Sequence, residues 1–245
     1  MSTATSPAEA LAEFYRRELI GELLYPVKSG KEATVYCCRG GPKTGVPLLA
    51  AKIYHDRERR NFHNDAVYHE GSVILNGRNR RAAAKKSSFG REFLFGSWVV
   101  REWETLRKLY NAGADVPRPI AYGSSALLME FVGDEDGPAP TLQSVHLNNE
   151  EAGPLLETLL RNIELWLACD RVHADLSPFN VLYHEGRITV IDFPQAVDPR
   201  LNNNARDLLR RDVENICRYF ARRGYEVNTA WFVDDLWDRF RRSAL

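Results

Sequence analysis

The sequence of 245 residues has few of the features that mark secreted, zinc-binding or membrane-spanning proteins. Its four cysteines show no C-x-x-C spacing, which argues against zinc and a disulfide framework and favours a reducing cytoplasm. No apolar run approaches the roughly 18 residues of a membrane span, and the N-terminus lacks the basic-then-apolar order of a signal peptide. Lysine plus arginine (33) equals aspartate plus glutamate (33), so net charge indicates no partner. We therefore expect a cytoplasmic protein without a membrane partner; the sequence leaves its oligomeric state open.

Apolar periodicity divides the chain into a strand-rich first part and a helical second part. Strands are expected within 25–36, 47–54, 120–122 and 126–131, and helices over 7–24, 98–110, 151–170, 205–223 and 229–242. Asn204 is expected to cap the fourth of these helices. The Gly-, Pro- and acid-rich segment 133–140 has the composition of a linker. We therefore predict an N-terminal lobe over 1–132 and a C-terminal lobe over 133–245, since 44% hydrophobic content can support two cores.

The most informative stretch is 173–192, which contains His173, Asp175, Asn180 and Asp192. Two β-branched, apolar runs, 181–183 and 188–191, flank the turn-like residues 184–187 and predict an antiparallel hairpin. A hairpin leaves and returns at one end, so Asn180 and Asp192 should lie together, because neighbouring strands are about 4.8 Å apart. Their oxygens suit a magnesium ion, and Asp175 in the preceding loop would face a nucleophile.

A structural role is the alternative for these residues. Asp175 and Ser177 could be turn residues, and Asn180 could simply begin a strand. For Asp175 alone that alternative is favoured, but the three positions together favour chemistry. His173 is expected to act as a structural donor that holds the loop backbone and the turn at Asp192.

Lys52 stands inside the hydrophobic segment 50–53, where an ammonium group must find a partner or lose solvation. One interpretation is an edge-strand lysine that reaches outward to water. The other is a phosphate ligand held by a carboxylate of the 98–110 helix. Glu102 is the best candidate for that carboxylate, and Glu104 is its rival.

The segment 29–36 joins two expected strands and contains Gly30 and Ala33, which lack bulk. Backbone amides there can approach a phosphate chain. A single glycine in a hairpin is ordinarily only a turn, so this signal is weak without its context.

These motifs together resemble the RIO family of atypical protein kinases, in particular the branch without an N-terminal winged-helix domain. The resemblance spans about residues 25–223. It rests on the segments 29–36, 51–54, 138–140, 172–177 and 191–195 and on the pair Trp98 and Glu102. The resemblance implies an α+β, bilobal, protein-kinase-like fold with a small β-rich N-lobe that has one main helix, and a helical C-lobe.

The resemblance also implies roles for individual residues. Asp175 would be the catalytic aspartate, which orients or deprotonates the acceptor hydroxyl. Asn180 and Asp192 would hold magnesium, for which manganese could substitute, and Asp192 could itself carry a phospho-aspartate. Phosphoryl transfer relies mainly on positioning and charge neutralisation, so few residues suffice.

A second set of residues would bind ATP by the same resemblance. It comprises Ser29, Gly30, Lys52, Glu102, Glu130 and Val132. The first four would hold or cover the phosphates, with Glu102 steadying Lys52. The backbone of the last two, in the predicted hinge 129–132, would hydrogen-bond adenine.

Departures from ordinary protein kinases are also informative. The chain has no G-x-G-x-x-G loop, which the RIO pattern does not require, and no A-P-E motif after Asp192. Only about a dozen residues separate Asp192 from the next expected helix, too few for an activation segment. We therefore expect the activation segment and the peptide-docking subdomains to be missing, which favours a narrow substrate, self-phosphorylation or ATP hydrolysis.

The leading hypothesis is a RIO-like serine/threonine kinase or ATPase that uses ATP and magnesium. The alternatives are a small-molecule kinase of the aminoglycoside or choline type and an ATP-timed ribosome-assembly factor. Residues 55–91 contain nine Lys/Arg against four Asp/Glu. A solvated, mobile loop is the first interpretation of this segment, and contact with RNA or a ribosomal subunit is the second.

Overall fold

A computed structural model describes residues 6–55 and 88–245, with the backbone alone for 88–97 and for Asn149. The described chain forms two compact units. Unit 1 contains residues 6–55, 88–104 and 117–138, and unit 2 contains 105–116 and 139–245. The predicted lobes, 1–132 and 133–245, follow chain order. In the structure, residues 105–116 belong to unit 2 and residues 133–138 belong to unit 1.

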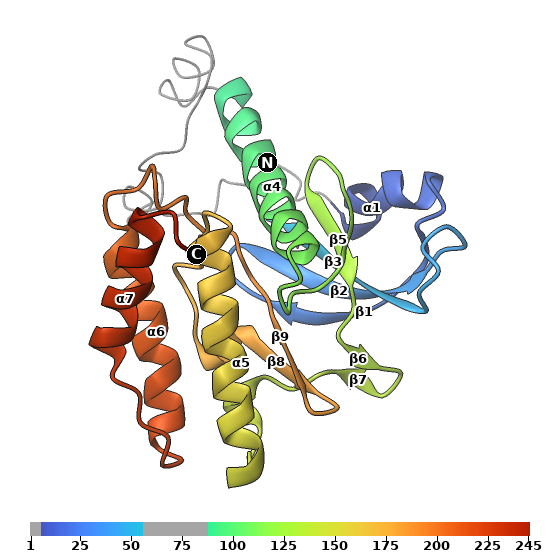
Figure 1. Ribbon diagram of the computed structural model, residues 1–245. Helices are drawn as coiled ribbons and strands as arrows, with labels where there is room; N and C mark the ends of the chain where they lie inside the picture. Colours follow the sequence, from blue (N-terminus) through green and yellow to red (C-terminus); the bar gives the residue numbers. More distant parts are fainter. Residues whose placement is uncertain (1–5, 56–87) are drawn as a thin grey trace. The chain divides into compact units, whose positions relative to one another are not determined.

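Unit 1 is built on a five-stranded sheet, drawn mainly in blue and light green in Figure 1. Its strand order is β1-β2-β3-β5-β4, and every neighbouring pair is antiparallel. The strands are β1 (Ile20–Ser29), β2 (Ala33–Gly40), β3 (Leu48–Tyr54), β4 (Pro119–Tyr122) and β5 (Ala126–Glu130). The predicted linker forms a small hairpin instead, β6 (Gly133–Asp134) with β7 (Gly137–Pro138), because Asp134 Oδ1 accepts the amides of Asp136 and Gly137 in its turn.

Helix α1 (Pro7–Arg16) covers the sheet with Leu11 and Phe14, both fully buried among residues of β1, β2, β3 and β5. The capping box of Ser6 and Glu9 fixes its start. The prediction of a helix to residue 24 was wrong. Glu18 adopts a left-handed conformation (φ 57°), and the chain turns into β1 at Ile20, because pairing with β2 outweighs the helical spacing of the apolar residues.

Helix α4 (Ser88–Asn111) includes the predicted 98–110 helix and extends it towards the N-terminus. Trp98, Glu102, Leu106 and Leu109 are all buried, as their helical spacing predicts. The division between the two units falls within this helix, after Glu104. The buried carboxylate of Glu102 therefore belongs to unit 1.

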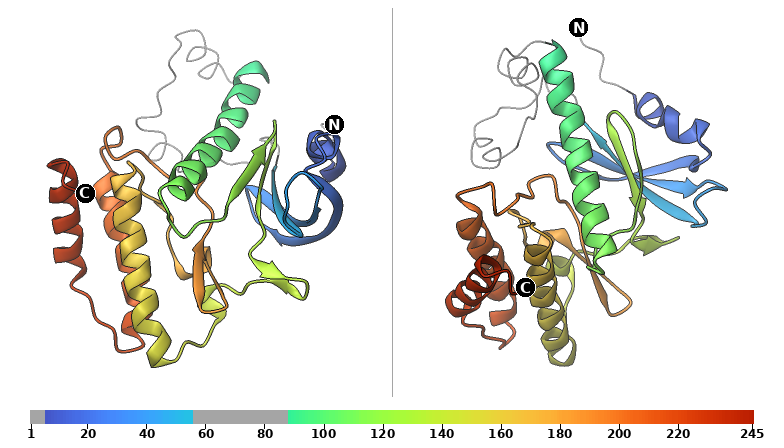
Figure 2. Two further views of the ribbon diagram at one scale, coloured as in Figure 1. Left: turned by 45° about the vertical axis from the view of Figure 1, so that its right-hand side comes forward. Right: turned by 45° about the horizontal axis from the view of Figure 1, so that its top comes forward.

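Unit 2 has three long helices that lie side by side, from yellow to red in Figures 1 and 2. They are α5 (Asn149–Ala168), α6 (Ala205–Ala221) and α7 (Thr229–Arg241). Asn148 and Glu151 form a capping box at α5. Asn204 occupies the N-cap position of α6, as predicted, but its side chain makes no cap hydrogen bond. Asn202 instead accepts the Asn204 amide at 2.8 Å. In the described part of the chain, no helix has the length and apolarity needed to cross a membrane.

Residues 173–192, the most informative stretch of the sequence, lie in unit 2. The short helices η2 (Leu142–Ser144) and η3 (Pro178–Asn180) accompany the hairpin of β8 (Val181–His184) and β9 (Arg187–Val190). In its two-residue turn, Glu185 (φ 49°) and Gly186 (φ 76°) both take positive φ, as a type I′ turn requires. The register pairs Val181 with Val190, so the residues before β8 and after β9 meet at one end, as predicted.

Candidate active site

Lys52 and Glu102 form a buried ion pair within unit 1. The Nζ atom of Lys52 lies 2.8 Å and 3.0 Å from the two carboxylate oxygens of Glu102. The Lys52 and Glu102 side chains are only 8% and 1% exposed. Strand β3 is flanked by β2 and β5, which excludes the edge-strand interpretation of Lys52. Glu104, the rival candidate, is exposed. The partner of Lys52 is therefore Glu102, as the sequence analysis preferred.

Replacing Glu102 with glutamine is expected to destabilise the protein by about 3 kcal/mol, because it removes the buried carboxylate charge that both oxygens of Glu102 offer to the Lys52 ammonium. Urea denaturation gives the free energy of unfolding that checks this expectation. The matched control is Glu104→Gln on the same helix, which should change stability by less than about 0.5 kcal/mol. Equal effects of the two substitutions would contradict the assigned pair.

The predicted phosphate-binding segment, 29–36, contains the connection between β1, which ends at Ser29, and β2, which begins at Ala33. Ser29 and Gly30 are exposed, and the Gly30 amide donates to the Ala33 carbonyl at 2.9 Å. Thr34 holds the loop, because its hydroxyl lies 3.1 Å from Ser29 Oγ and 2.8 Å from His55 Nε2. The loop is thus tied to the end of the strand that carries Lys52. His55 was not among the predicted site residues.

The predicted hinge, 129–132, comprises the last two residues of β5 and the two residues after it. The Glu130 amide donates to the Arg118 carbonyl at 2.9 Å, and the Arg118 amide donates to Glu130 Oε2 at 3.2 Å. Val132 is half-buried and lies outside any strand. Because its amide is engaged, Glu130 would contact an adenine through its carbonyl.

In unit 2 the structure brings Asp175, Asn180 and the turn at Asp192 together. Asn180 Nδ2 donates to the Asp175 carbonyl at 2.9 Å, and the Asn180 carbonyl accepts the amide of Ile191 at 2.9 Å. Asn180 is therefore linked both to the loop before the hairpin and to the residue before Asp192. Since Nδ2 is used, the orientation of the carboxamide leaves Oδ1 for a cation.

His173 braces this arrangement, as predicted. Its Nε2 lies 3.2 Å from the Ile191 carbonyl, and its Nδ1 lies 3.3 Å from the Asp175 amide. A carbonyl only accepts and an amide only donates, so these partners select the neutral tautomer with hydrogen on Nε2. The ring also packs against Phe193 and Trp166 at centroid distances of 4.5 Å and 5.8 Å. His173 is thus a structural donor.

The electrostatics around Asp175 suit an acid–base group. Asp175 is an exposed residue, but neighbouring atoms remove part of the hydration of its carboxylate. This desolvation, and then the nearby Asp192 carboxylate, raise the pKa of Asp175, while Arg211 and Asn180 act in the opposite direction. Asp192 itself has φ 73°, a left-handed conformation that is uncommon for non-glycine residues but that aspartate and asparagine adopt more readily than others.

Three residues of α6 support the catalytic loop and were missed in the sequence analysis. Asp212 is 2% exposed and accepts the amides of Ala174 at 2.7 Å and Leu176 at 2.9 Å. Its burial raises the pKa of this carboxyl to about 7, against the opposing effect of those amides. Arg211 donates to the Ala174 carbonyl, and Asn215 donates to the Leu176 carbonyl at 3.1 Å.

A signal for Asp212 was present in the sequence. It lies on the apolar face of α6, beside the buried Leu208, Leu209, Val213 and Ile216. A carboxylate on a buried face needs hydrogen-bond partners, and this could have indicated a bracing role. The identity of those partners could not be read from the sequence, because the catalytic loop is 36–38 residues away.

The donor set fits magnesium that is held jointly with a phosphate ligand. In the described ranges, no three His, Cys, Asp or Glu side chains are grouped so that they could hold a metal ion. Magnesium is usually bound by one or two carboxylates together with substrate phosphates, rather than by an all-protein cage. The Asp192 carboxylate and Asn180 Oδ1 meet that requirement, and a cation there would relieve the repulsion between Asp175 and Asp192.

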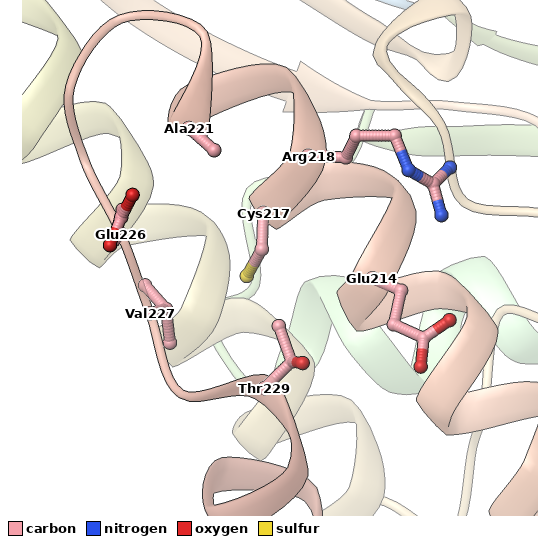
Figure 3. A pocket seen from close by; sticks show the side chains of 7 residues that line it. All are labelled: Glu214, Cys217, Arg218, Ala221, Glu226, Val227 and Thr229. Atoms are coloured by element: carbon pink, nitrogen blue, oxygen red, sulfur yellow. The ribbon is translucent and has the colours of Figure 1, made fainter.

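A pocket of about 320 Å³ lies elsewhere in unit 2, between α6 and the start of α7 (Figure 3). Its lining consists of Glu214, Cys217, Arg218, Ala221, Glu226, Val227 and Thr229. None of the predicted site residues lines it. The thiol of Cys217 is no nucleophile at neutral pH, since burial raises its pKa to about 11.

Comparison with known proteins identifies the family. Residues 34–231 match the RIO domain, which is most of the chain. The chain belongs to the RIO family. Serine/threonine-protein kinase RIO1 of Caenorhabditis elegans is 32% identical over 209 residues, covering 82% of this chain and 37% of that protein. RIO-type serine/threonine-protein kinase Rio1 of Haloferax volcanii is 33% identical over 204 residues, covering 83% of this chain and 64% of that protein. The chain thus spans between about one third and two thirds of these relatives.

Solved RIO structures share the fold. The Rio2 kinase of Chaetomium thermophilum, in an ADP/Mg²⁺-phosphoaspartate complex, superposes with a TM-score of 0.67 at 22% identity, covering 93% of this chain and 64% of that chain. The same kinase in a second structure gives a TM-score of 0.66 at 23% identity. The predicted family and the α+β, kinase-like fold are therefore confirmed. The family match also favours the RIO hypothesis over a small-molecule kinase.

The basic segment 55–91 lies largely outside the described residues. Contact with RNA or a ribosomal subunit stays a prediction.

Proposed function

We propose that this RIO protein is an ATP- and magnesium-dependent phosphotransferase or ATPase. The observation that carries the proposal is the loop that joins Asp175, Asn180 and the turn at Asp192 by backbone and side-chain hydrogen bonds. Its curated relatives are serine/threonine-protein kinases, which supports the same reaction class. The four cysteines are free, three of them buried, in keeping with a proposed cytoplasmic location.

Asp175 would orient the acceptor hydroxyl and accept its proton. A raised pKa brings its carboxylate closer to the operating pH, which improves a general base. Asn180 and Asp192 would hold magnesium, which supplies charge neutralisation for the phosphates when bound. The side chains of His173 and Asn180 hold the backbone of Asp175 before any ligand is present, so its orientation is set in advance.

In unit 1, Lys52 would contact the ATP phosphates, and Glu102 would keep its ammonium group in place. Ser29 and Gly30 are exposed and available to cover the phosphates. The Glu130 carbonyl and the Val132 backbone would hydrogen-bond adenine.

A phospho-aspartate step is compatible with the same residues. The γ-phosphoryl group would pass from ATP to a carboxylate oxygen of Asp192, giving ADP and an acyl phosphate. Water would then hydrolyse the acyl phosphate to inorganic phosphate and restore the carboxylate. The Rio2 complex of Chaetomium thermophilum contains ADP, Mg²⁺ and a phosphoaspartate, which supports this proposal for a member of the same family.

Incubation with γ-³²P-labelled ATP and magnesium tests the proposed function directly. We expect label in free phosphate, in the protein, or in both, and we expect chelation of magnesium by EDTA to abolish it. Acid-stable label on the protein indicates a phosphoserine or phosphothreonine, whereas label lost in hydroxylamine indicates an acyl phosphate. If all label stays in ATP at micromolar protein over hours, the proposal is wrong.

A further inference from the structure

The backbone around Asp175 is held almost entirely by side chains. Three consecutive residues, 174–176, offer three amides and three carbonyls, and a side chain bonds each of them. His173 accepts the Asp175 amide and Asn180 donates to the Asp175 carbonyl. The other four groups are held by Asp212, Arg211 and Asn215 of one helix, α6. No strand or helix ladder holds this segment, so these side chains define its conformation.

The peptide unit that links Ala174 to Asp175 is the critical part of this arrangement. Arg211 binds its carbonyl, and His173 binds its amide. Ala174 has φ 65°, a left-handed conformation that an alanine adopts only when its surroundings impose it. If the carbonyl contact is lost, this peptide unit can rotate, and the Asp175 side chain then changes direction.

We propose that Arg211 is a positioning residue for phosphoryl transfer, because it fixes the peptide unit before Asp175 and thereby the direction of the Asp175 carboxylate. This inference rests on the proposed function and deepens it. Arg211 holds the backbone before Asp175, and its charge, which Arg211→Lys keeps, separately lowers the pKa of the Asp175 carboxyl. Loss of Arg211 should therefore slow the chemical step and leave ATP affinity nearly unchanged, because no proposed ATP contact depends on it.

The test compares Arg211→Met, which keeps length but removes the donors, with Arg211→Lys, which keeps one donor group and the charge. For Arg211→Met we expect kcat to fall by about 10- to 100-fold, as for other misplaced catalytic groups, with the KM for ATP changed by less than about threefold. Arg211→Lys should recover a substantial part of kcat. The matched control is Arg206→Met on the same helix, because Arg206 pairs with the exposed Asp234 at 2.9 Å and should leave kcat unchanged.

Hydrogen exchange of the Asp175 amide gives a second readout that needs no activity. Arg211→Met should speed this exchange by about tenfold or more, and Arg206→Met should not. A wild-type kcat in Arg211→Met, or unchanged exchange of the Asp175 amide, would overturn the inference. So would a fall in activity that matches the fraction of the variant that is unfolded. If the wild type turns over no ATP, the proposed function fails, and the exchange measurement alone still decides the role of Arg211.

Discussion

Asp175→Asn is expected to lower the turnover number by about 10²- to 10⁴-fold while ATP and magnesium still bind. Asparagine has nearly the shape of aspartate, but it cannot accept the proton of an acceptor hydroxyl. The backbone of residue 175 is held by His173 and Asn180. The substitution therefore removes the group that accepts the proton and leaves the loop conformation unchanged.

Steady-state turnover of labelled ATP and ATP binding by calorimetry together check this expectation. Asp207→Asn provides the control, since Asp207 is an exposed aspartate of the same unit, in the first turn of α6. It should leave both quantities unchanged. Turnover in Asp175→Asn within threefold of wild type would remove Asp175 from the mechanism.

Asp192→Asn should remove the magnesium-dependent part of the stabilisation by ATP. A ligand at 100 times its Kd stabilises a folded protein by about 2.7 kcal/mol, and this gain falls as the Kd rises. Asparagine is the appropriate replacement, because it tolerates the left-handed conformation (φ 73°) of residue 192 better than alanine does. The ligand-free protein should therefore melt at nearly the wild-type temperature.

Thermal melting with ATP, in magnesium and in EDTA, measures the effect of Asp192→Asn. Wild type should gain several degrees when magnesium is added to ATP, and Asp192→Asn should gain almost none. A wild-type response to magnesium in the variant would show that Asp192 is not a ligand. Asp198→Asn is not a suitable control, because Asp198 pairs with Arg200 and Arg171, so Asp207→Asn serves here as well.

Regular periodicity allowed part of the site to be predicted. Lys52 stood in an apolar run, and Glu102 shared a helical face with Trp98, Leu106 and Leu109. Burial of both charges made their pairing the favoured outcome. The hairpin turn at residues 185 and 186 likewise fixed the register that brings Asn180 to the residue before Asp192. In both cases the predictive signal was local in the sequence.

Other features depended on contacts between distant segments. Helix α1 ends early because the following residues pair with β2, and this competition is not visible in the helical spacing of Leu11, Phe14 and Leu19. The bracing of the catalytic loop by Arg211, Asp212 and Asn215 connects residues 36–39 positions apart. Single-sequence patterns do not specify such long-range partners.

The central claim is that one divalent ion is held by Asn180 and Asp192, from the two ends of one β-hairpin, next to Asp175. Manganese, a paramagnetic substitute for magnesium, tests it most directly when added with ATP to isotopically labelled protein. We predict that NMR signals from residues 175–181 and 191–193 broaden first, and that Asp192→Asn prevents the broadening. Sharp signals in both segments, with broadening elsewhere in the chain, would contradict the account.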